Sequence, residues 1–198
     1  MKRLILASAS ATRAKLLAAA GLDFEVVPAS VDESAVKRAA IAAGDDAAAA
    51  ARRLAAEKAS FVAQFEPDAI VLGADQILNL DGVPVSKCRD TKEAVSMLRR
   101  LRGRTHELVT AAALAANGSV IWGHADICRM TMRCFSDVFL DTYISRAGAA
   151  LVQCVGCYEF EGLGAQLFES VEGDFFSILG LPLLPLLAAL REHDVTGQ

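Results

Sequence analysis

The chain has 198 residues, a net charge of −4 at pH 7 and a pI near 5.4. Apolar residues make up 54% and charged residues 22%, which is the balance of a globular protein and excludes an intrinsically disordered one. The acidic balance excludes general attraction to nucleic acid or to an anionic membrane, although a few well-placed cations suffice to bind a small phosphate-bearing ligand.

Targeting and membrane signals are weak. The apolar stretch at residues 4–7 is too short for a signal core, and the longest one, residues 178–190, is interrupted by two prolines and too short to span a bilayer. The five cysteines follow no disulfide framework, which indicates reduced thiols. We therefore expect a cytoplasmic protein with no membrane partner.

The first third of the chain alternates between strand and helix patterns. Residues 2–7 are typical of a buried strand, and residues 11–20 are typical of a helix. Residues 24–27 predict a second strand. A long helix then runs to about residue 65 from a capping aspartate, which is either Asp45 or Asp46.

The middle of the chain is rich in strands. Residues 69–74 (AIVLGA) form an unbroken apolar run, typical of a strand covered on both faces, and we expect this strand to end at Asp75. Two hairpins follow, one turning at Asp81-Gly82 and a longer one turning at Asn117-Gly118.

The remaining elements complete an α/β pattern. They are expected to be helices over residues 91–101 and 137–147, the latter capped by Ser136, then a strand over 166–171 and a closing helix from Pro182. Strands that alternate with helices, together with long hairpins, predict an α/β fold with a mixed sheet. No linker divides the chain, so we expect one domain over residues 1–198.

The first predicted strand leads directly into a phosphate-binding pattern. Ser8, Ser10 and Arg13 bring two hydroxyls and a guanidinium to the start of a helix, where free backbone N–H groups and the helix dipole attract anions. An arginine there can grip a phosphate with a bidentate fork. The alternative is structural: a capping serine beside a solvated arginine.

Carboxylates and lysines supply further candidates. Asp75 follows the buried strand and can bind a metal or take a proton from water, or it is a turn aspartate. Glu33, beside Asp32, can help to hold Mg²⁺, but the pair can equally lie in a loop. Lys58 and Lys87 can act as point charges on phosphates, although most lysines are simply solvated.

Two further patterns carry less chemistry on their own. The turn Glu161-Gly-Leu-Gly164 is a weak glycine motif. The segment Cys154-Val-Gly-Cys157 has the spacing of a redox CxxC motif, but no second CxxC accompanies it, and we interpret the spacing as incidental. The three histidines lack the spacing of metal ligands.

Taken together, the motifs resemble the Maf family of nucleotide pyrophosphatases. The resemblance runs from LILASASATRAKLL at residues 4–17, through VDE at 31–33 and AEKA at 56–59, to GADQ at 73–76. It continues through Lys87 and LRRLRGRTH at 98–106 to the segment beginning EFEGLGAQ at residue 159. The order and spacing of these pieces cover nearly the whole chain.

The resemblance implies a fold and a reaction. The fold is similar to that of the inosine triphosphate pyrophosphatases: an elongated mixed sheet flanked by helices, with two lobes around a cleft, often as a dimer. The reaction is hydrolysis of a nucleoside triphosphate to the monophosphate and pyrophosphate with Mg²⁺ or Mn²⁺. Asp75 and Glu33 would serve catalysis and the metal, and either can be the general base. Lys87 would assist, and the phosphates would be held by Ser8, Ser10, Arg13 and Lys58.

Substrate choice follows a finer resemblance. Gln76 and Glu161 match the branch of the family similar to 7-methyl-GTP pyrophosphatases, and Thr12 stands at a specificity position. A carboxylate can accept two N–H bonds from a guanine edge, whereas an amide offers one acceptor and one donor. The alternatives are a dTTP/UTP pyrophosphatase and a nucleotide-binding regulator of septum formation with little turnover.

Overall fold

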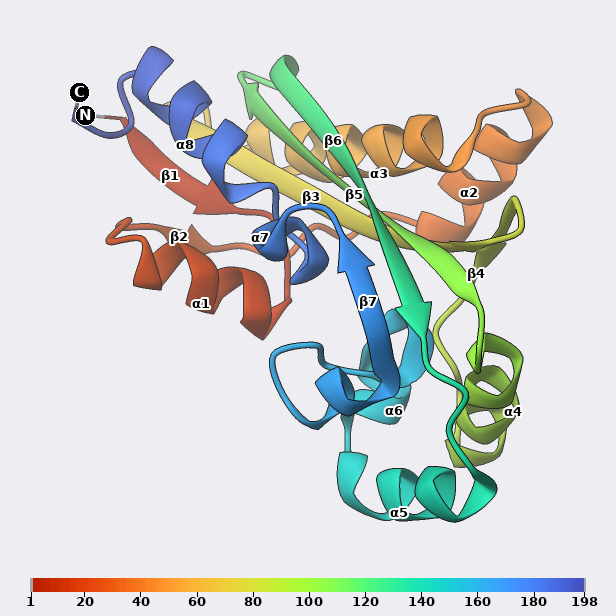
Figure 1. Ribbon diagram of the computed structural model, residues 1–198. Helices are drawn as coiled ribbons and strands as arrows, with labels where there is room; N and C mark the ends of the chain where they lie inside the picture. Colours follow the sequence, from red (N-terminus) through yellow and green to blue (C-terminus); the bar gives the residue numbers. More distant parts are fainter. Residues whose placement is uncertain (1, 198) are drawn as a thin grey trace. The chain divides into compact units, whose positions relative to one another are not determined.

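The computed structural model describes residues 2–197 (Figure 1). Its strands are β1 (Arg3–Leu6), β2 (Glu25–Val26), β3 (Ala69–Leu80), β4 (Val83–Val85), β5 (Thr105–Ala116), β6 (Ser119–Met132) and β7 (Phe168–Glu172). Its helices are α1 (Ala11–Ala19), α2 (Glu33–Ala42), α3 (Ala47–Ala63), α4 (Thr91–Leu101), α5 (Asp137–Ala147), α6 (Ala150–Gln153), α7 (Phe175–Ile178) and α8 (Leu183–Glu192). Two 3-10 turns, η1 (Val155–Cys157) and η2 (Leu163–Leu167), lie between α6 and β7.

The strands form one mixed sheet, in agreement with the predicted α/β fold. Their order is β2-β1-β3-β5-β6-β7, with β4 paired to β3. The pairings of β1 with β2 and with β3 are parallel, whereas β3 with β4 and β6 with β7 are antiparallel. Within residues 2–197, no helix combines the length and the apolar character that a bilayer crossing requires.

The chain divides into two compact units, in agreement with the two expected lobes. The first unit comprises the residues up to Gln76, Thr110–Asp126, and the residues from Asp174 onward. The second comprises Ile77–Val109 and Ile127–Gly173. Strands β3, β5 and β6 therefore contribute residues to both units.

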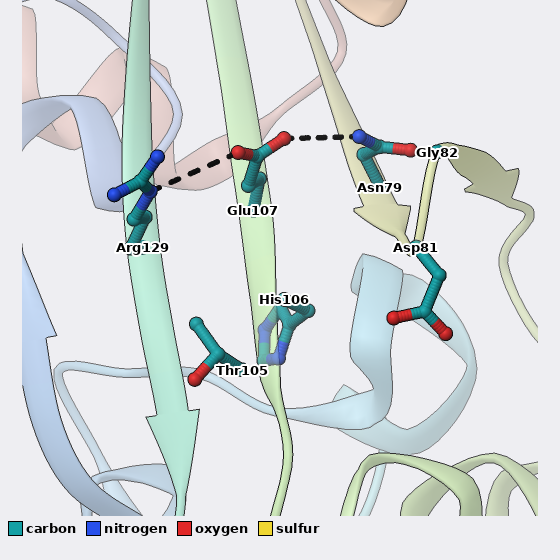
Figure 2. Close-up of a pocket in the computed structure, with 7 residues that line it drawn as sticks. All are labelled: Asn79, Asp81, Gly82, Thr105, His106, Glu107 and Arg129. Atoms are coloured by element: carbon teal, nitrogen blue, oxygen red, sulfur yellow. Dashed lines mark hydrogen bonds and ion pairs between the residues drawn. The ribbon is translucent and has the colours of Figure 1, made fainter.

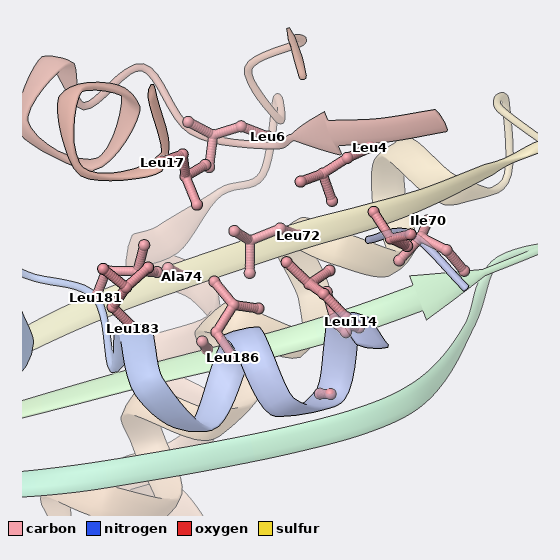
Figure 3. Packing of buried hydrophobic residues seen from close by; sticks show 14 residues of the cluster. Leu4, Leu6, Leu17, Ile70, Leu72, Ala74, Leu114, Leu181, Leu183 and Leu186 are labelled. Carbon is pink, nitrogen blue, oxygen red and sulfur yellow. The ribbon is translucent and has the colours of Figure 1, made fainter. Parts of the chain in front are cut away.

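The core of the first unit lies between the sheet and helix α8. Figure 3 shows Ile70, Leu72 and Ala74 of β3 pointing toward the leucines of this helix, and Leu17 of α1 joins the same cluster. The neighbouring residue Gly73 points to the opposite face, where it meets α3. Because side chains alternate along a strand, β3 packs against α8 with one face and against α3 with the other.

The second unit is built around helix α4 and a group of aromatic rings. Helix α4 contacts α5, α6 and η1. The Tyr158 and Phe168 rings pack edge to face with their centroids 4.8 Å apart, and the His106 ring lies beside both. Rings with this geometry bury a large apolar area, so they stabilise a unit that has few long helices.

Most of the predicted elements are confirmed, and both predicted hairpin turns are correct. Asp81, Gly82, Asn117 and Gly118 all have positive φ, as a two-residue hairpin turn requires. Strand β2 is shorter than expected, with two residues instead of four.

Near the candidate site one expectation was wrong, and one alternative that the sequence left open is excluded. Strand β3 does not end at Asp75 but continues to Leu80, because Ile77, Leu78 and Leu80 extend the buried strand beyond the carboxylate. Glu33 does not lie in a loop but in the first turn of α2, where the Asp32 side chain accepts a hydrogen bond from the Ala35 N–H. An aspartate followed by a short apolar-periodic stretch is a helix start, and this signal was overlooked.

Candidate active site

The centre of the candidate site is a lysine held between two carboxylates in the first unit. Lys58 Nζ on α3 lies 2.6 Å from Asp75 Oδ1 on β3 and 2.7 Å from Glu33 Oε1 on α2. Lys58 and Asp75 are buried, at 8% and 6% exposure, whereas Glu33 is exposed. A buried ammonium or carboxylate is costly without a partner, so each of these two charges stabilises the other.

Close packing of α3 on β3 brings this lysine to the aspartate. A Cβ added at Gly73 would lie 2.2 Å from the Ala55 carbonyl oxygen and 2.6 Å from the Ala59 nitrogen. Only glycine permits this approach of helix to strand. Gly73 and Asp75 lie on the same face of β3, and Lys58 precedes Ala59 on the helix, so the glycine sets the spacing between the two charges.

The Asp75 carboxylate retains one free oxygen. Its Oδ2 is fully buried and has no hydrogen-bond partner among the described residues. A buried unsatisfied carboxylate oxygen costs free energy unless a ligand completes it. This atom is therefore a candidate contact for a cation, a water or a substrate proton.

Arg13 of α1 is also buried, which contradicts the solvated alternative. Its Nε donates to the Gly180 carbonyl at 2.9 Å, and its Nη1 lies 3.0 Å from both Ser8 Oγ and the Ala74 carbonyl. Burial lowers the pKa of the guanidinium, while the charges of Asp75 and Glu33 raise it. A bidentate grip on phosphate would require Nη1 to leave these acceptors, so Nη2 is the nitrogen best placed to reach a ligand.

The start of α1 gathers the remaining candidates of the first predicted motif. Ser10 caps the helix by accepting from the Arg13 N–H, and the buried Ser8 hydroxyl accepts from the Ser10 N–H. Thr12 lies in the first helical turn and is half-buried. Since first-turn N–H groups have no partner inside a helix, this turn offers donors to an anion.

Gln76 contributes to packing in the first unit. Its side-chain nitrogen lies within hydrogen-bonding distance of Thr110 Oγ1 and of the Ser177 and Ile178 carbonyls. The amide nitrogen thus joins β3 to β5 and α7. Only its Oε1 is left as an acceptor for a nucleobase.

Lys87 and Glu161 belong to the second unit, and both are exposed. Within residues 2–197 neither takes part in an ion pair. Burial raises the pKa of the half-buried Cys154 thiol, Lys87 lowers it and Glu161 raises it. The lysine and the glutamate therefore both lie near Cys154.

The second unit also contains two hollows. One, of about 190 Å³, is lined by polar residues, and Figure 2 shows Glu107 between Asn79 and Arg129 there. None of the candidate site residues lines it. The other, of about 320 Å³, is lined by Lys87, Cys88, Glu93 and Arg100 among others, so its cationic side chains outnumber its acidic ones.

The carboxylates of the candidate site fit an ion such as Mg²⁺ only if a substrate supplies further oxygen ligands. Among residues 2–197 no group of three or more His, Cys, Asp or Glu side chains is placed to hold a metal. Mg²⁺, however, commonly takes one or two protein carboxylates and completes its shell with waters and substrate phosphates. The orphaned Asp75 Oδ2 and the Glu33 carboxylate match that requirement.

The sequence did not predict the residues whose backbone carbonyls hold side chains of the candidate site in place. The Ala74 and Gly180 carbonyls hold Arg13, and Gly180 adopts φ +101°, which favours glycine. The Ser177 carbonyl accepts from Thr110 and Gln76. The only available signal was the glycine in Leu-Gly-Leu-Pro before the last helix.

Comparison with known proteins decides the family. The family model described as Maf-like protein matches residues 3–193 of the chain. The chain belongs to the Maf family. It is 47% identical over 192 residues to a Granulibacter bethesdensis protein named nucleoside triphosphate pyrophosphatase, covering 97% of this chain and 98% of that protein.

Other relatives agree in family and differ in name. The chain is 47% identical over 189 residues to a Rhizobium meliloti protein named 7-methyl-GTP pyrophosphatase, covering 96% of this Maf chain and 95% of the relative. Among solved structures, a HAM1 protein from Coxiella burnetii aligns with a TM-score of 0.44 and 16% identity, over 68% of this chain and 75% of that one.

Proposed function

We propose that this Maf protein is a nucleoside triphosphate pyrophosphatase that hydrolyses the α–β phosphoanhydride and releases a nucleoside monophosphate and pyrophosphate. The observation that carries the proposal is the buried Lys58, paired with Asp75 at 2.6 Å and with Glu33 at 2.7 Å. A buried cation beside carboxylates is suited to a substrate that brings both phosphate charge and a divalent metal.

The cations of the first unit would hold the phosphates. In the free protein Lys58 neutralises two carboxylates, and phosphate oxygens would compete for the same ammonium when the nucleotide enters. Arg13 Nη2, the Ser8 and Ser10 hydroxyls and the N–H groups of the first turn of α1 would supply further donors. These fixed donors stabilise charge that develops on the leaving pyrophosphate.

The carboxylates would act on water. Water supplies the new oxygen on phosphorus, the bridging P–O bond breaks, and the proton lost by water passes to Asp75. Its Oδ2 is the accepting atom in this proposal because it is buried and has no partner among the described residues. Glu33, exposed at the start of α2, would orient the same water.

A divalent cation, Mg²⁺ or Mn²⁺, would be held by the Asp75 and Glu33 carboxylates and by the substrate phosphates. When bound, it would neutralise phosphate charge and lower the pKa of a water. Lys58 must then exchange carboxylate partners for phosphate, so its release and the entry of the metal would be linked.

Lys87 and Glu161 of the second unit would complete the substrate contacts, Lys87 at the phosphates and Glu161 at the base. Thr12 and the Gln76 Oε1 atom are the candidates of the first unit for reading the base or sugar. The preferred base in this proposal is 7-methylguanine. Support comes from the acceptor pair of a carboxylate at Glu161 and from relatives named 7-methyl-GTP pyrophosphatase.

A nucleotide panel tests the proposal. The purified protein is incubated with Mg²⁺ or Mn²⁺ and 7-methyl-GTP, GTP, dTTP, UTP or CTP, and both products are measured. Preference for 7-methyl-GTP that falls in Glu161→Gln supports both reaction and base. Preference for dTTP or UTP keeps the reaction and rejects the base. Nucleotide binding without turnover rejects the enzyme and favours a regulator of septum formation.

We further propose that residues 1–198 act as one domain, in the cytoplasm, as a homodimer and without nucleic acid or membrane partners. The free thiols of all five cysteines and the net charge of −4 support this setting. The dimer rests on the family resemblance alone. Light scattering over a range of protein concentrations tests it, since a monomer at every concentration would reject it.

A further inference from the structure

Two buried cysteines meet in the second unit. Cys157 Sγ in η1 donates a hydrogen bond to Cys88 Sγ at 3.3 Å, although the two residues lie 69 positions apart in the chain. Both thiols are free, and their exposures are 0% and 8%. A disulfide has an S–S length of about 2.05 Å, so the sulfurs need to approach by little more than 1 Å.

The position of Cys157 is fixed by its neighbours. The buried Tyr143 hydroxyl of α5 donates to the Cys157 carbonyl at 2.9 Å. Gly156, with φ +78°, packs so closely that an added Cβ would lie 2.6 Å from the Tyr158 ring and 2.7 Å from Leu78. These contacts fix the backbone of Cys157 and so hold its thiol beside that of Cys88.

Cys88 is the member of the pair that a small molecule can reach. It lines the hollow of about 320 Å³, together with the cationic side chains of Lys87 and Arg100. These two cations outnumber Glu93, the acidic residue that also lines the hollow, so the hollow attracts reagents that carry carboxylates. Cys157 lies behind it and is fully buried.

The arrangement favours a disulfide over a metal site. All five cysteines lie in this unit, yet no group of three or more metal-ligating side chains is placed to hold a metal among residues 2–197. The sulfur that meets Cys157 Sγ is that of Cys88, at 3.3 Å, although the CxxC spacing pairs Cys157 with Cys154.

We propose that Cys88 and Cys157 are a reversible oxidation site. The two cysteines form an intramolecular disulfide when a small carboxylate-bearing disulfide, such as oxidised glutathione, oxidises them. The Cys88 thiolate attacks one glutathione sulfur, and a glutathione thiolate leaves. Cys157 then gives up its proton as its sulfur attacks Cys88 Sγ, and the second glutathione leaves as a thiolate. Two protein thiols are oxidised, one glutathione disulfide is reduced, and the two thiol protons pass to the leaving thiolates.

The bond would restrain the segment that carries Lys87. Cys88 directly follows this lysine, so a link to η1 would tie the segment between β4 and α4 to a second part of the same unit. This consequence rests on the proposed function, in which Lys87 contacts the phosphates. The oxidation site itself does not depend on that function.

Peptide mapping of the full chain tests the site. The protein is incubated with oxidised glutathione, free thiols are blocked, and linked peptides are identified by mass spectrometry, with Cys134→Ser as a control that alters an exposed cysteine. We expect a Cys88–Cys157 link in the wild type and the control, reversal by dithiothreitol, and an increase in Tm of roughly 5–10 °C. A link between Cys154 and Cys157, links between molecules only, or no link overturns the proposal.

An activity measurement tests the restraint separately. Oxidation is expected to lower pyrophosphate release at least several-fold in the wild type and in Cys134→Ser, and to leave Cys88→Ser unchanged. A mapped Cys88–Cys157 link with unaltered release overturns the restraint of Lys87. If no nucleotide is hydrolysed at all, the mapped link and the Tm still decide the oxidation site, so its failure and the failure of the proposed function are distinguishable.

Discussion

Among the described residues, side chains of Asp, Glu, Lys and Arg are buried only in the first of the two compact units. The first unit buries charges: Arg13, Lys58 and Asp75 are each less than 10% exposed, and Lys58 and Asp75 form an ion pair. The second unit buries neutral groups. Burial lowers the pKa of His106 to about 4 and raises the pKa values of Tyr158 and Cys157, so none of the three is ionised near neutral pH.

Buried charged groups and buried neutral polar groups serve different purposes in a protein. Buried charges are costly and are often retained where a charged ligand offsets the cost, which supports the proposed roles of Arg13, Lys58 and Asp75. Buried neutral groups bind one another, as His106 Nε2 and the Tyr158 hydroxyl do at 2.7 Å, and they stabilise packing. The charges that the second unit offers a ligand, Lys87 and Glu161, are exposed instead.

The largest expected effect comes from removing the charge of Lys58. Lys58→Met leaves the buried Asp75 without its cation, so the free energy of unfolding is expected to fall by about 4 kcal/mol and pyrophosphate release to fall at least about a thousandfold. Chemical denaturation and product assays measure both. The control is Lys15→Met, which removes an exposed lysine of α1.

A double variant sharpens that test. Lys58→Met combined with Asp75→Asn removes both charges and is expected to recover part of the lost stability, because the unpaired buried carboxylate is gone. Stability losses that simply add would show that the two side chains are not coupled.

The next effect is a pH dependence in the second unit. The folded pKa of His106 is about 4 and its ordinary value is about 6.5, so the unfolded chain binds the proton first as pH falls. Stability should therefore fall between about pH 6.5 and pH 4, by roughly 3 kcal/mol from this residue. His106→Gln is expected to flatten this part of the profile, and identical slopes in both proteins would show that His106 ionises freely.

A smaller effect is expected at Gly73. In Gly73→Ala the new methyl group would overlap the Ala55 carbonyl of α3, so the helix must move away from β3 and separate Lys58 from Asp75. We expect a loss of about 2 kcal/mol in the free energy of unfolding and a lower kcat. The matched control is Gly123→Ala on β6, where the nearest atom is 3.9 Å away.

The smallest stability effect is expected at Lys87. Because Lys87 is exposed and has no ion pair among the described residues, Lys87→Met should change the free energy of unfolding by less than about 0.5 kcal/mol. Pyrophosphate release should nevertheless fall, mainly through a higher KM. A destabilised variant would contradict the division between buried and exposed charges drawn above.

Sequence patterns predicted the elements well where local signals are strong. The turns at Asp81-Gly82 and Asn117-Gly118 and the caps at Asp46 and Ser136 follow from backbone geometry and short-range hydrogen bonds. The predicted end of β3 was wrong because an aspartate after a buried apolar run normally indicates that the strand has ended. Here Lys58, seventeen positions earlier in the chain, neutralises the carboxylate inside the strand.

The site was predictable by residue type and not by contact. Serines, an arginine and a buried-strand aspartate indicated anion and metal chemistry. Their actual partners are backbone carbonyls and a helix that only Gly73 allows to approach, and such contacts join distant segments of the chain. The meeting of Cys88 with Cys157 was likewise not predicted, because the two residues lie 69 positions apart in the chain.

The most direct test of the central claim compares the wild type with Asp75→Asn on 7-methyl-GTP and dTTP in the presence of Mg²⁺, with Asp68→Asn as an exposed-aspartate control. The account predicts monophosphate and pyrophosphate in equal amounts from the wild type and from the control. It predicts a loss of at least about a thousandfold in Asp75→Asn, with the fold retained. Release that persists within tenfold of the wild type in Asp75→Asn, or orthophosphate as the product, would contradict it.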